Sequence, residues 1–528
     1  MNPHPWLRRA ALLLIAVTVS AAPARALTTE ALLDTLQHTA FNYFWNEANP
    51  ANGMVKDRST AGSVSSIACT GFGLSAIAIG IDHGWITRTQ GRNRVLTTLT
   101  TFRNGPQGGT ASGTIGFHGL FWHWLDMTTA TRTWDSELST IDTALLLAGI
   151  IDVREYFDTS DPGDTLVRSY ADSIVRRCNW NLMTNFGTGL YMGYKPGTGF
   201  NGFGRWQGYN EAMIMYLLAL GSPTWPIATN NWGYWTGTYN YATHYGRTFI
   251  TFPPLFGHQY SHCWIDFRDI RDPYTSARDL DYFENSRRAT LAQQAYCIAN
   301  PGGFTGYNAL TWGITASDIQ GGYLARGAPP AQNDNGTLAP TAAASSIPFA
   351  PEIVIPTLHN LYDGFPLLWS TYGFRDAFNP GTGWYDTDVL GIDQGPILIM
   401  IENYRTGRVW ERMMGNSVIQ TGLDRAGFVS TVGVEPFAGG AARVELAPAM
   451  PNPARTDFTL RFRLPEAGHV RITLVDVSGR QVGEVLDAVR PAGEHAVVAP
   501  VRELRAGIYF ARLEWQGRVV GRRVAVVR

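Results

Sequence analysis

Nine consecutive apolar or aromatic residues, 212–220, are followed directly by Gly221. A helix that is apolar on every side belongs inside a large fold, because no face of it can be left in water. The residues at its entrance are of the types that hold and cleave sugars: Trp206, Gln207, Tyr209, Asn210 and Glu211. A lone carboxyl group at the mouth of a buried helix has few hydrating neighbours, so its protonated form is favoured. We therefore expect a proton donor at Glu211.

The low content of charged residues and the high content of aromatic residues limit the classes of protein to which the chain can belong. Charged residues make up 16% of the 528 residues, whereas aromatic residues reach 12% and include 17 Trp. A formal net charge of −1 argues against electrostatic binding to nucleic acid. The length allows one core of several hundred residues and a smaller module.

The first 26 residues have the pattern of an export signal. Arg8 and Arg9 precede a largely apolar stretch, residues 10–19, and residues 24–26 (Ala-Arg-Ala) fit the rule for cleavage. No later segment reaches about 18 uninterrupted apolar residues. We expect a secreted, periplasmic or cell-surface protein with no transmembrane segment in its mature form. An uncleaved N-terminal anchor is the alternative.

The four cysteines do not indicate a metal site. Zinc sites usually contain a CxxC pair, and none occurs here. Export permits disulfides, yet four well-spaced cysteines can equally be small buried apolar residues. Both interpretations stay open for Cys69, Cys178, Cys263 and Cys297.

Helical patterns dominate from residue 28 to about residue 415. The predicted helices span roughly residues 28–46, 65–83, 89–103, 136–157, 164–179, 209–221, 279–299, 351–363 and 396–405. Long loops rich in Gly, Pro, Asn and aromatic residues lie between them, and such loops tend to carry function. We expect a toroid of helical hairpins whose loops frame a cleft. A solenoid is the rival architecture, but no fixed-period repeat is present.

The pattern changes after residue 431. A Gly/Ala-rich linker covers residues 431–443, and residues 444–528 carry alternating segments that predict a small β-sandwich of about 85 residues. The clearest strands are expected at residues 458–464, 470–477, 494–501, 507–515 and 518–527.

A second acidic motif stands at residues 133–149. Asp142 shares the apolar, inward face of the predicted helix with Leu138, Leu145 and Leu146, and Ser136 or Ser139 can cap that helix. A buried carboxylate must be paired or hydrogen-bonded, or its pKa shifts. Asp142 is thus either a structural acid or a sugar-binding or catalytic one. For Glu137, near the start of that helix, a partner of the helix dipole without chemistry is the alternative.

A third motif surrounds Asp393. Pro396 suits the first position of a helix, which would leave Asp393 just before the N-terminus. The helix dipole would then keep Asp393 ionised, as a general base requires. A capping aspartate without chemistry is the alternative. For Glu211, burial must outweigh the same dipole if it is to serve as the acid.

Further aromatic and polar clusters occur at residues 117–124 and 256–266. The second contains His258, Gln259 and His262, whose side chains could bond sugar hydroxyls. His258 and His262 are spaced for a shared metal, but no third ligand motif is nearby, so we expect no metal. Most of the aromatic residues are expected in the core.

Several of these segments, taken in order, resemble the bacterial glucoamylase-like family. They are residues 136–147, 208–212 (Gly-Tyr-Asn-Glu-Ala), 257–262, 311–318 and 391–396 (Gly-Ile-Asp-Gln-Gly-Pro). The family includes endo-β-1,2-glucanases and a domain of cyclic β-1,2-glucan synthases, and the resemblance covers nearly all of residues 28–415. It implies an (α/α)6 barrel and glycoside hydrolysis, by inversion in the β-1,2-glucanases.

Carried over by motif, the resemblance makes Glu211 the acid and Asp393 the base. It implies a substrate-binding set around them: Glu137, Asp142, Trp206, Tyr209, His258, Gln259, His262, Trp312 and Asp318. No cofactor is implied.

The tail resembles the immunoglobulin-like modules of secretion tails and flagellar hook caps. The resemblance rests on residues 448–453, 475–480 and 506–510. Similar modules route proteins through type IX secretion, so that machinery is an implied partner. A spacer or wall-binding role is the alternative.

The sequence thus predicts a secreted hydrolase of a β-glucan, most simply a β-1,2-glucan, that works by single displacement. Two rivals stay open. One is a carbohydrate-binding protein of the same fold without chemistry, and the other is a polysaccharide lyase, because helical toroids host both activities.

Overall fold

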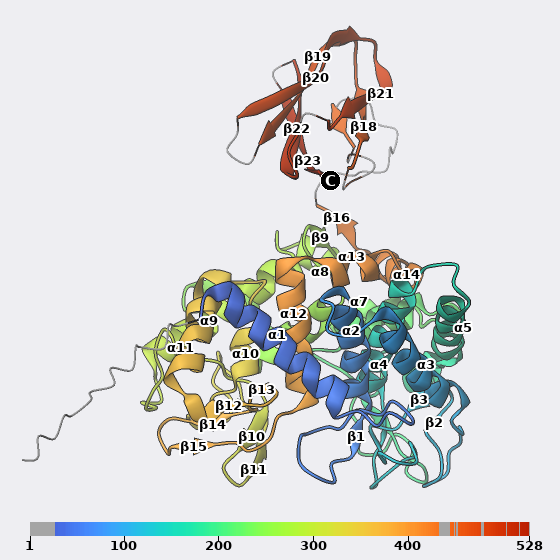
Figure 1. The fold of residues 1–528 in the computed structure, drawn as a ribbon, viewed down its shortest axis with the longest axis vertical. Coiled ribbons are helices and arrows are strands. Elements are labelled where there is room, and N and C mark those ends of the chain that lie inside the picture. The colour runs from blue at the N-terminus through green and yellow to red at the C-terminus, as the bar shows by residue number, and fades with distance from the viewer. Residues whose placement is uncertain are drawn as a thin grey trace, which may run out of the picture. The chain divides into compact units, whose positions relative to one another are not determined.

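The structure, a computed structural model, describes residues 27–431, 444–447, 449, 452, 454–476, 480–502, 504–516 and 518–526. The chain divides into two compact units between Val429 and Ser430 (Figure 1). The first is mostly helical and the second is rich in strands. The predicted export signal and residues 432–443 of the predicted linker lie outside the described residues.

Each of the nine predicted helices is present, and shorter ones lie between them. The helices are α1 (Thr29–Asn46), α2 (Ile67–Asp82), α3 (Arg88–Asn104), α4 (Thr140–Tyr156), α5 (Pro162–Arg177), α6 (Met213–Gly221), α7 (Asn230–Thr236), α8 (Pro273–Ser276), α9 (Tyr282–Ala299), α10 (Pro340–Ala344), α11 (Pro351–Gly364), α12 (Gly391–Arg405), α13 (Arg408–Met414) and α14 (Ser417–Ala426). Single 3-10 turns are η1 (Trp180–Thr184), η2 (Leu255–His258), η3 (Tyr260–Cys263) and η4 (Pro366–Leu368).

Buried and half-buried helices alternate along the first half of this unit. α2, α4 and α6 are buried on almost every side, whereas α1, α3 and α5 each bury one face. α2 packs against α4, and α12 packs against α1 and α2. The nine-residue apolar run lies in the core of the fold, as predicted, because every residue of α6 is buried.

Two glycines set the distance between α2 and α4. A Cβ atom on Gly149 would lie 1.9 Å from the carbonyl oxygen of Gly71, and one on Gly71 would lie 2.3 Å from the carbonyl oxygen of Leu145. Any side chain at either position would force the two backbones apart. Ser66 and Ser139 cap the N-termini of these helices with their hydroxyl groups.

The long loops are pinned by short antiparallel strand pairs. Sequence patterns did not reveal these pairs, because two to four residues are too few to show alternation. Most gather at one end of the helical unit, below the helices in Figure 1. The strands of this unit are β1 (Ser65–Ser66), β2 (Gly116–Phe117), β3 (Leu120–Phe121), β4 (Trp124–Leu125), β5 (Leu138–Ser139), β6 (Gly193–Tyr194), β7 (Tyr241–His244), β8 (Arg247–Ile250), β9 (Ile270–Arg271), β10 (Ser317–Ile319), β11 (Gly322–Leu324), β12 (Trp369–Ser370), β13 (Gly373–Phe374), β14 (Phe378–Asn379) and β15 (Trp384–Tyr385), and β16 (Val429–Ser430) follows at the division.

The second unit contains a three-stranded sheet in the order β17-β18-β21 and a four-stranded sheet in the order β20-β19-β22-β23. Alternating residues of both sheets share one apolar core. β20 was not predicted, since two register shifts against β19 accompany its pairing. The strands are β17 (Glu445–Leu446), β18 (Asp457–Leu464), β19 (Gly468–Asp476), β20 (Gln481–Arg490), β21 (Gly493–Pro500), β22 (Gly507–Trp515) and β23 (Arg518–Val526).

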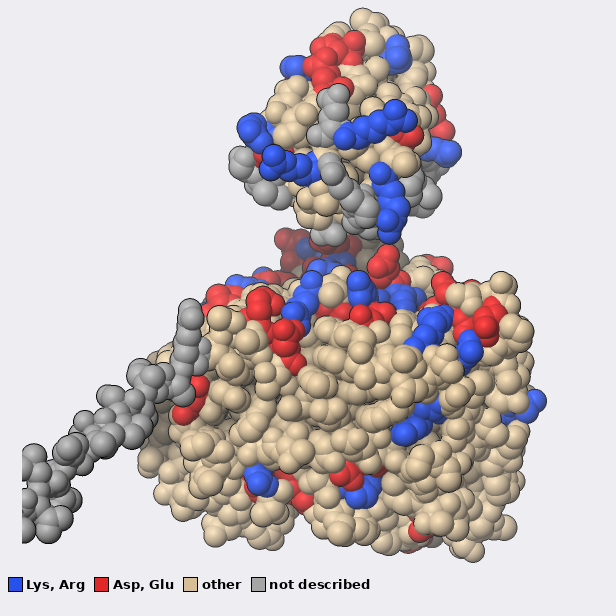
Figure 2. Space-filling model, viewed as in Figure 1, with Lys and Arg blue, Asp and Glu red and all other residues tan. Residues whose placement is uncertain are grey.

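Charge on the helical unit is sparse and mixed. On the face that Figure 2 shows, Lys, Arg, Asp and Glu gather along one edge with both signs interspersed, and most of the remaining surface carries none. No broad basic field lies on this face, which agrees with the net charge of −1. Among the described helices, none combines the length and the hydropathy needed to cross a bilayer.

Candidate active site

The helical unit brings three acidic residues together through the N-terminal ends of its buried helices. Asp142 lies in the first turn of α4, Asp393 lies in the first turn of α12, and Glu211 lies two residues before α6. Asp142 is close enough to raise the pKa of Glu211. The three motifs that sequence analysis singled out therefore belong to one region of the molecule.

Glu211 has the environment of a proton donor. Its side chain is half-buried, and its Oε2 atom is buried without a hydrogen-bond partner. Burial raises the pKa of Glu211 to about 7, and the negative charge of Asp142 adds to the rise. Burial thus outweighs the helix dipole here. The N-cap position of α6 is Ala212, which has no side-chain cap, and the Oδ1 atom of Asn210 accepts a hydrogen bond from the backbone N–H of Ala212 just before the helix.

A histidine that sequence analysis did not assign joins the second acidic motif. The Nδ1 atom of His123 lies 2.9 Å from Oε1 of Glu137, and its Nε2 atom lies 3.6 Å from Oδ2 of Asp142. Burial opposes the charge of the imidazole, but Asp142 and Glu137 raise the pKa of His123 to about 9. Glu137 is correspondingly held ionised, because the hydrogen bond from His123 lowers its pKa against the effect of burial. Glu137 is therefore more than a helix-dipole partner.

His123 could have been found from its stretch of sequence. It lies immediately before β4, in the aromatic cluster at residues 117–124, and its ring stacks on Trp124 with centroids 3.9 Å apart. Its side chain is one-quarter exposed, as is that of Glu137. A protonated imidazole beside two carboxylates is accessible to a ligand here.

Asp393 differs from the sequence prediction in both position and charge. α12 begins at Gly391, so Asp393 lies inside the helix and Pro396 is an interior residue. Desolvation and the neighbouring Asp376 raise the pKa of Asp393 well above its ordinary value, and Oδ2 of Asp393 is buried without a hydrogen-bond partner. The expectation of a simple ionised aspartate before the helix was wrong. A like charge and burial outweigh the helix dipole.

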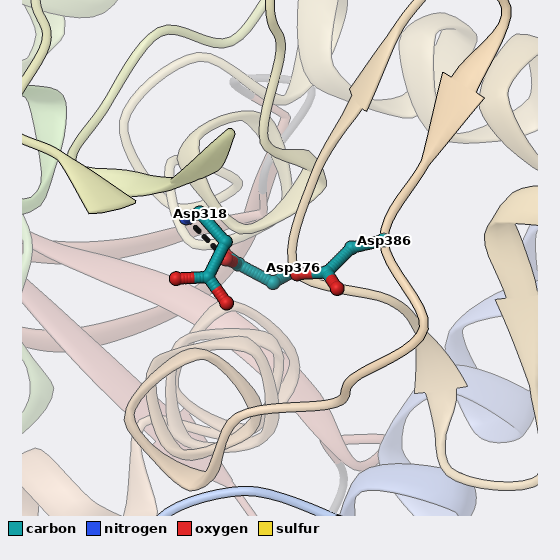
Figure 3. A group of neighbouring side chains, drawn as sticks. All are labelled: Asp318, Asp376 and Asp386. Atoms are coloured by element: carbon teal, nitrogen blue, oxygen red, sulfur yellow. Dashed lines mark hydrogen bonds between the residues drawn. The ribbon is translucent and has the colours of Figure 1, made fainter. Parts of the chain in front are cut away.

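Asp318 belongs to the same carboxyl cluster. One carboxylate oxygen from each of Asp318, Asp376 and Asp386 lies within 4.8 Å of the others. Figure 3 shows these three side chains beside one another. The backbone N–H of Asp318 donates to Oδ2 of Asp376 at 2.6 Å. Such spacing would admit a divalent cation with oxygen ligands. The donor set alone does not define a metal site, because protonation relieves the same repulsion.

One arginine binds the outer side of this cluster. The Nη1 atom of Arg58 lies 2.8 Å from Asp318 and 3.3 Å from Asp388, and its Nε atom lies 3.3 Å from Asp57. Arg58 lies in the loop before β1, so these ion pairs connect that loop to the segments around residues 318 and 388. Arg58 is one-third exposed, and Asp318 and Asp388 are largely buried.

Two tyrosines lie within electrostatic range of both Glu211 and Asp393. The hydroxyl of Tyr260, in η3, donates to the carbonyl of Ile392, and burial together with Asp393 and Glu211 raises its pKa well above the ordinary value. Tyr323, in β11, is 64% exposed, and its pKa is raised by burial of the hydroxyl and then by Glu211. Neither was assigned from the sequence. Tyr260 lies in the 256–266 cluster, beside the assigned residues Gln259 and His262.

Several predicted substrate-binding side chains lie in the core instead. His258 and His262 are fully buried and neutral, because desolvation lowers their pKa values to about 3. Gln259 donates to the carbonyl of Ala342 and to the hydroxyl of Ser346. Their burial argues against direct contact with a sugar, and the same holds for the buried rings of Tyr209 and Trp312.

The two 3-10 turns η2 and η3 account for the burial of His258, Gln259 and His262. The backbone turns so tightly that His258, Gln259 and His262 face the protein interior, while Tyr260 faces the acids. Trp206 is also buried, with its indole N–H bonded to Thr140 at the start of α4. Trp206 thereby connects the segment that carries Glu211 to the N-terminal end of α4, which carries Asp142.

The cysteines contribute no cross-link. All four are buried and free, so the disulfide alternative is ruled out in this structure. Cys69 lies in the first turn of α2, near Asp57, and burial raises the pKa of its thiol well above the ordinary value. The thiols are small apolar residues of the core.

Two family models match the chain. The family described as "Putative glucoamylase" matches residues 204–417, which include Glu211 and Asp393. The family described as "Secretion system C-terminal sorting domain" matches residues 449–527, within the strand-rich unit.

Solved structures and a curated relative agree with the first match. A "putative glucoamylase" from Bacteroides uniformis is 35% identical, with 76% of this chain and 98% of that chain covered and a TM-score of 0.71. An endo-β-1,2-glucanase from Chitinophaga pinensis is 30% identical, with 77% and 99% covered and a TM-score of 0.71.

A curated relative from Parabacteroides distasonis, an exo-β-1,2-glucooligosaccharide sophorohydrolase acting at the non-reducing end, is 31% identical over 433 residues. The match covers 76% of this chain and 58% of that protein, so the chain spans little more than half of its length. Because a family model, the helical fold and relatives of 30% identity or more covered almost end to end all agree, this chain belongs to the glucoamylase-like family.

Proposed function

We propose that this protein is an exported glycoside hydrolase that cleaves a β-1,2-glucan by single displacement. Glu211 is the general acid and Asp393 is the general base. The observation that carries the proposal is that two acids at the N-terminal ends of buried helices lie within range of the same two tyrosines. Glu211 has a pKa of about 7 and a buried oxygen without a partner, while Asp393 lies in a carboxyl cluster within range of the same two tyrosines.

The proposed chemistry uses no group beyond these side chains and water. Glu211 donates its proton to the glycosidic oxygen as the bond from that oxygen to the anomeric carbon breaks. Asp393 takes a proton from a water molecule, whose oxygen forms the new bond on the opposite face of the sugar. The products are two shorter sugars, and the configuration at the new reducing end is inverted.

The remaining acids have supporting roles in this proposal. The cation at His123 keeps Glu137 ionised as an acceptor for sugar hydroxyls, and Asp142, on the other side of the His123 ring, is a second acceptor. Asp318 on β10 is paired with the exposed Tyr323 on β11. In this proposal both side chains bind further glucose units of the glucan. The β-1,2 linkage is proposed from the names of the two relatives, an endo-β-1,2-glucanase and a sophorohydrolase.

Two architectural proposals accompany the function. The alternation of buried and half-buried helices supports an (α/α)6 barrel, with the site at the N-terminal ends of the inner helices. The two sheets that share one core support an immunoglobulin-like sandwich for residues 444–528. The match of residues 449–527 to a sorting domain supports export and secretion machinery as a partner.

A lyase is the less favourable assignment. Such an enzyme needs a tyrosine or histidine base beside an arginine that is free to bind a uronate carboxylate. Arg58 already binds Asp57, Asp318 and Asp388, and the hydroxyl of Tyr260 is hard to ionise because its pKa is raised.

A panel of purified glucans of defined linkage tests the function. We expect new reducing ends from β-1,2-glucan, without the ultraviolet absorption of unsaturated products. Absorbing products from a uronate polymer would establish a lyase, and binding without any product would establish a carbohydrate-binding protein.

A further inference from the structure

An exposed tryptophan lies at the outer end of a row of rings that begins at the candidate acids. Trp134 has 67% of its surface exposed, in the loop between β4 and β5. Its ring contacts the half-buried Trp124, with 5.8 Å between centroids and 63° between planes, and Trp124 in turn stacks on His123. The imidazole of His123 lies beside Glu137 and Asp142. The row of rings therefore runs from the acidic site to the surface.

The backbone of Trp134 has a conformation that a residue of this size rarely adopts. Its φ angle is +55°, in the left-handed region that favours glycine. The Cβ atom of a larger residue crowds the following carbonyl oxygen there, so the conformation persists only where surrounding contacts impose it. Burial of the indole does not offset this strain, because two-thirds of the side chain is exposed. Strained residues of this kind cluster at ligand sites.

Two ion pairs hold the loop that presents Trp134. Asp135 pairs with Arg132 at 3.0 Å and with Lys195 at 2.7 Å. Arg132 is buried, and its Nε atom donates to the carbonyl of Ser136 at 2.7 Å. Lys195 directly follows β6, the strand that pairs with β5. The loop is thus anchored to its own base and to a neighbouring segment, so the indole is oriented before any ligand binds.

A flat, exposed indole suits the chemistry of a glucan. The faces of a β-glucose ring carry C–H groups and its hydroxyl groups project around the edge. Such a ring can therefore stack on an aromatic face while its hydroxyls stay hydrogen-bonded. Because the row of rings begins at the acids, a glucan chain held there for cleavage can extend along the row to Trp134.

We propose that Trp134 is a stacking platform for a glucose unit remote from the cleaved bond, and that it gives the enzyme a preference for longer glucans. The inference rests on the proposed function, in which the acids near His123 cleave a glucan. A glucose unit on Trp134 is bound equally in the ground state and in the transition state. Loss of the indole should therefore raise KM and leave kcat nearly unchanged.

The length of the substrate provides the first test. Trp134→Ala should raise KM roughly tenfold on long β-1,2-glucan with kcat within about twofold, and it should leave KM unchanged for the shortest β-1,2-glucooligosaccharide that is cleaved. Trp134→Phe keeps a ring and should stay within about threefold of the wild type. The matched control is Trp225→Ala, at a tryptophan that is 42% exposed and follows the end of α6 opposite to Glu211. An equal rise in KM on short and long substrates, or no rise on either, would overturn the proposal.

Thermal melting separates ligand binding from a structural role. Glycine relieves the left-handed backbone, so Trp134→Gly should melt at a higher temperature than Trp134→Ala and no lower than the wild type. Its KM on long β-1,2-glucan should nevertheless be raised as much as that of Trp134→Ala. A lower melting temperature in Trp134→Gly with an unchanged KM would identify a packing residue instead.

Isothermal titration measures the platform without turnover. In a Glu211→Gln background, long β-1,2-glucan should bind roughly tenfold more weakly after Trp134→Ala and equally well after Trp225→Ala. If the wild type cleaves a glucan of another linkage, the substrate assignment is wrong and the same comparison is made on that glucan. If the wild type cleaves β-1,2-glucan and the Trp134→Ala protein binds it as tightly as its parent, the assignment holds and the platform is refuted.

Discussion

The Nε2 atom of His123 lies 3.6 Å from Oδ2 of Asp142, the carboxylate that raises the pKa of Glu211. The imidazole is charged at neutral pH, since its pKa is raised to about 9. It therefore offsets part of the repulsion that Asp142 exerts on an ionised Glu211. Burial is the main cause of the raised pKa of the proposed acid, and Asp142, the ion-pair partner of His123, adds to it.

Replacing His123 should change the pH dependence of the enzyme. Without the cation, Asp142 opposes ionisation of Glu211 more strongly, so the pKa of Glu211 should rise. The alkaline limb of kcat/KM should then move to higher pH in His123→Gln. The control is His359→Gln, a histidine on α11 that contacts Thr29. An unchanged alkaline limb, or a shift of that limb to lower pH, would show that His123 does not lower the pKa of Glu211.

Glu211→Gln should remove most turnover while glucan binding persists. General acid catalysis is typically worth about 10²–10⁴ in rate, and glutamine keeps the shape without the proton. Initial rates and isothermal titration with β-1,2-glucan measure the two properties. Glu284→Gln on α9, where Glu284 pairs with Arg288, is the matched control. Turnover near the wild-type rate in Glu211→Gln would assign the acid to another residue.

The same substitution should stabilise the protein at alkaline pH. Glu211 has an ordinary pKa of 4.5 in the unfolded chain and about 7 in the folded one. The folded state therefore binds the proton more tightly, and wild-type stability falls as the pH rises from about 4.5 through 7. Glutamine does not titrate, so the melting temperature of Glu211→Gln relative to wild type should increase between pH 5 and pH 8. The change corresponds to at most about 3 kcal/mol. A difference that is constant with pH would contradict the raised pKa.

Single displacement makes a stereochemical prediction. Proton NMR of fresh products from a β-glucan should show the α-anomer first, before mutarotation mixes the two forms. Asp393→Ala should lose most activity, and azide should not rescue it through a product of retained configuration. If the β-anomer appears first, Asp393 is not a base in single displacement.

The strand-rich unit should be dispensable for catalysis. All proposed site residues lie before residue 430, where the chain divides. A truncated chain that ends at Phe437 should keep its activity per mole on a soluble glucan. Loss of activity in a truncated protein whose helical circular dichroism is intact would show that the tail takes part in the site.

The sequence predicted the helices well and the site only partly. Helices such as α1 and α9 are long enough for their periodicity to average over many turns, and capping residues mark their ends. The strand pairs of two to four residues carry no such signal. Within the 256–266 cluster, residue type alone could not separate the core residues His258 and His262 from Tyr260, which faces the acids.

The sequence by itself determined that residues 212–220 form a buried helix, that Glu211 stands at its mouth, and that Asp142 faces inward, because these properties follow from local pattern and polarity. Only the tertiary structure decided the charge states. Asp376 and Asp393 are 17 positions apart, with two short strands between them, and His123 reaches Asp142 from another segment. Ionisation depends on distances of a few ångströms between charges and on exclusion of water, and folding alone sets both.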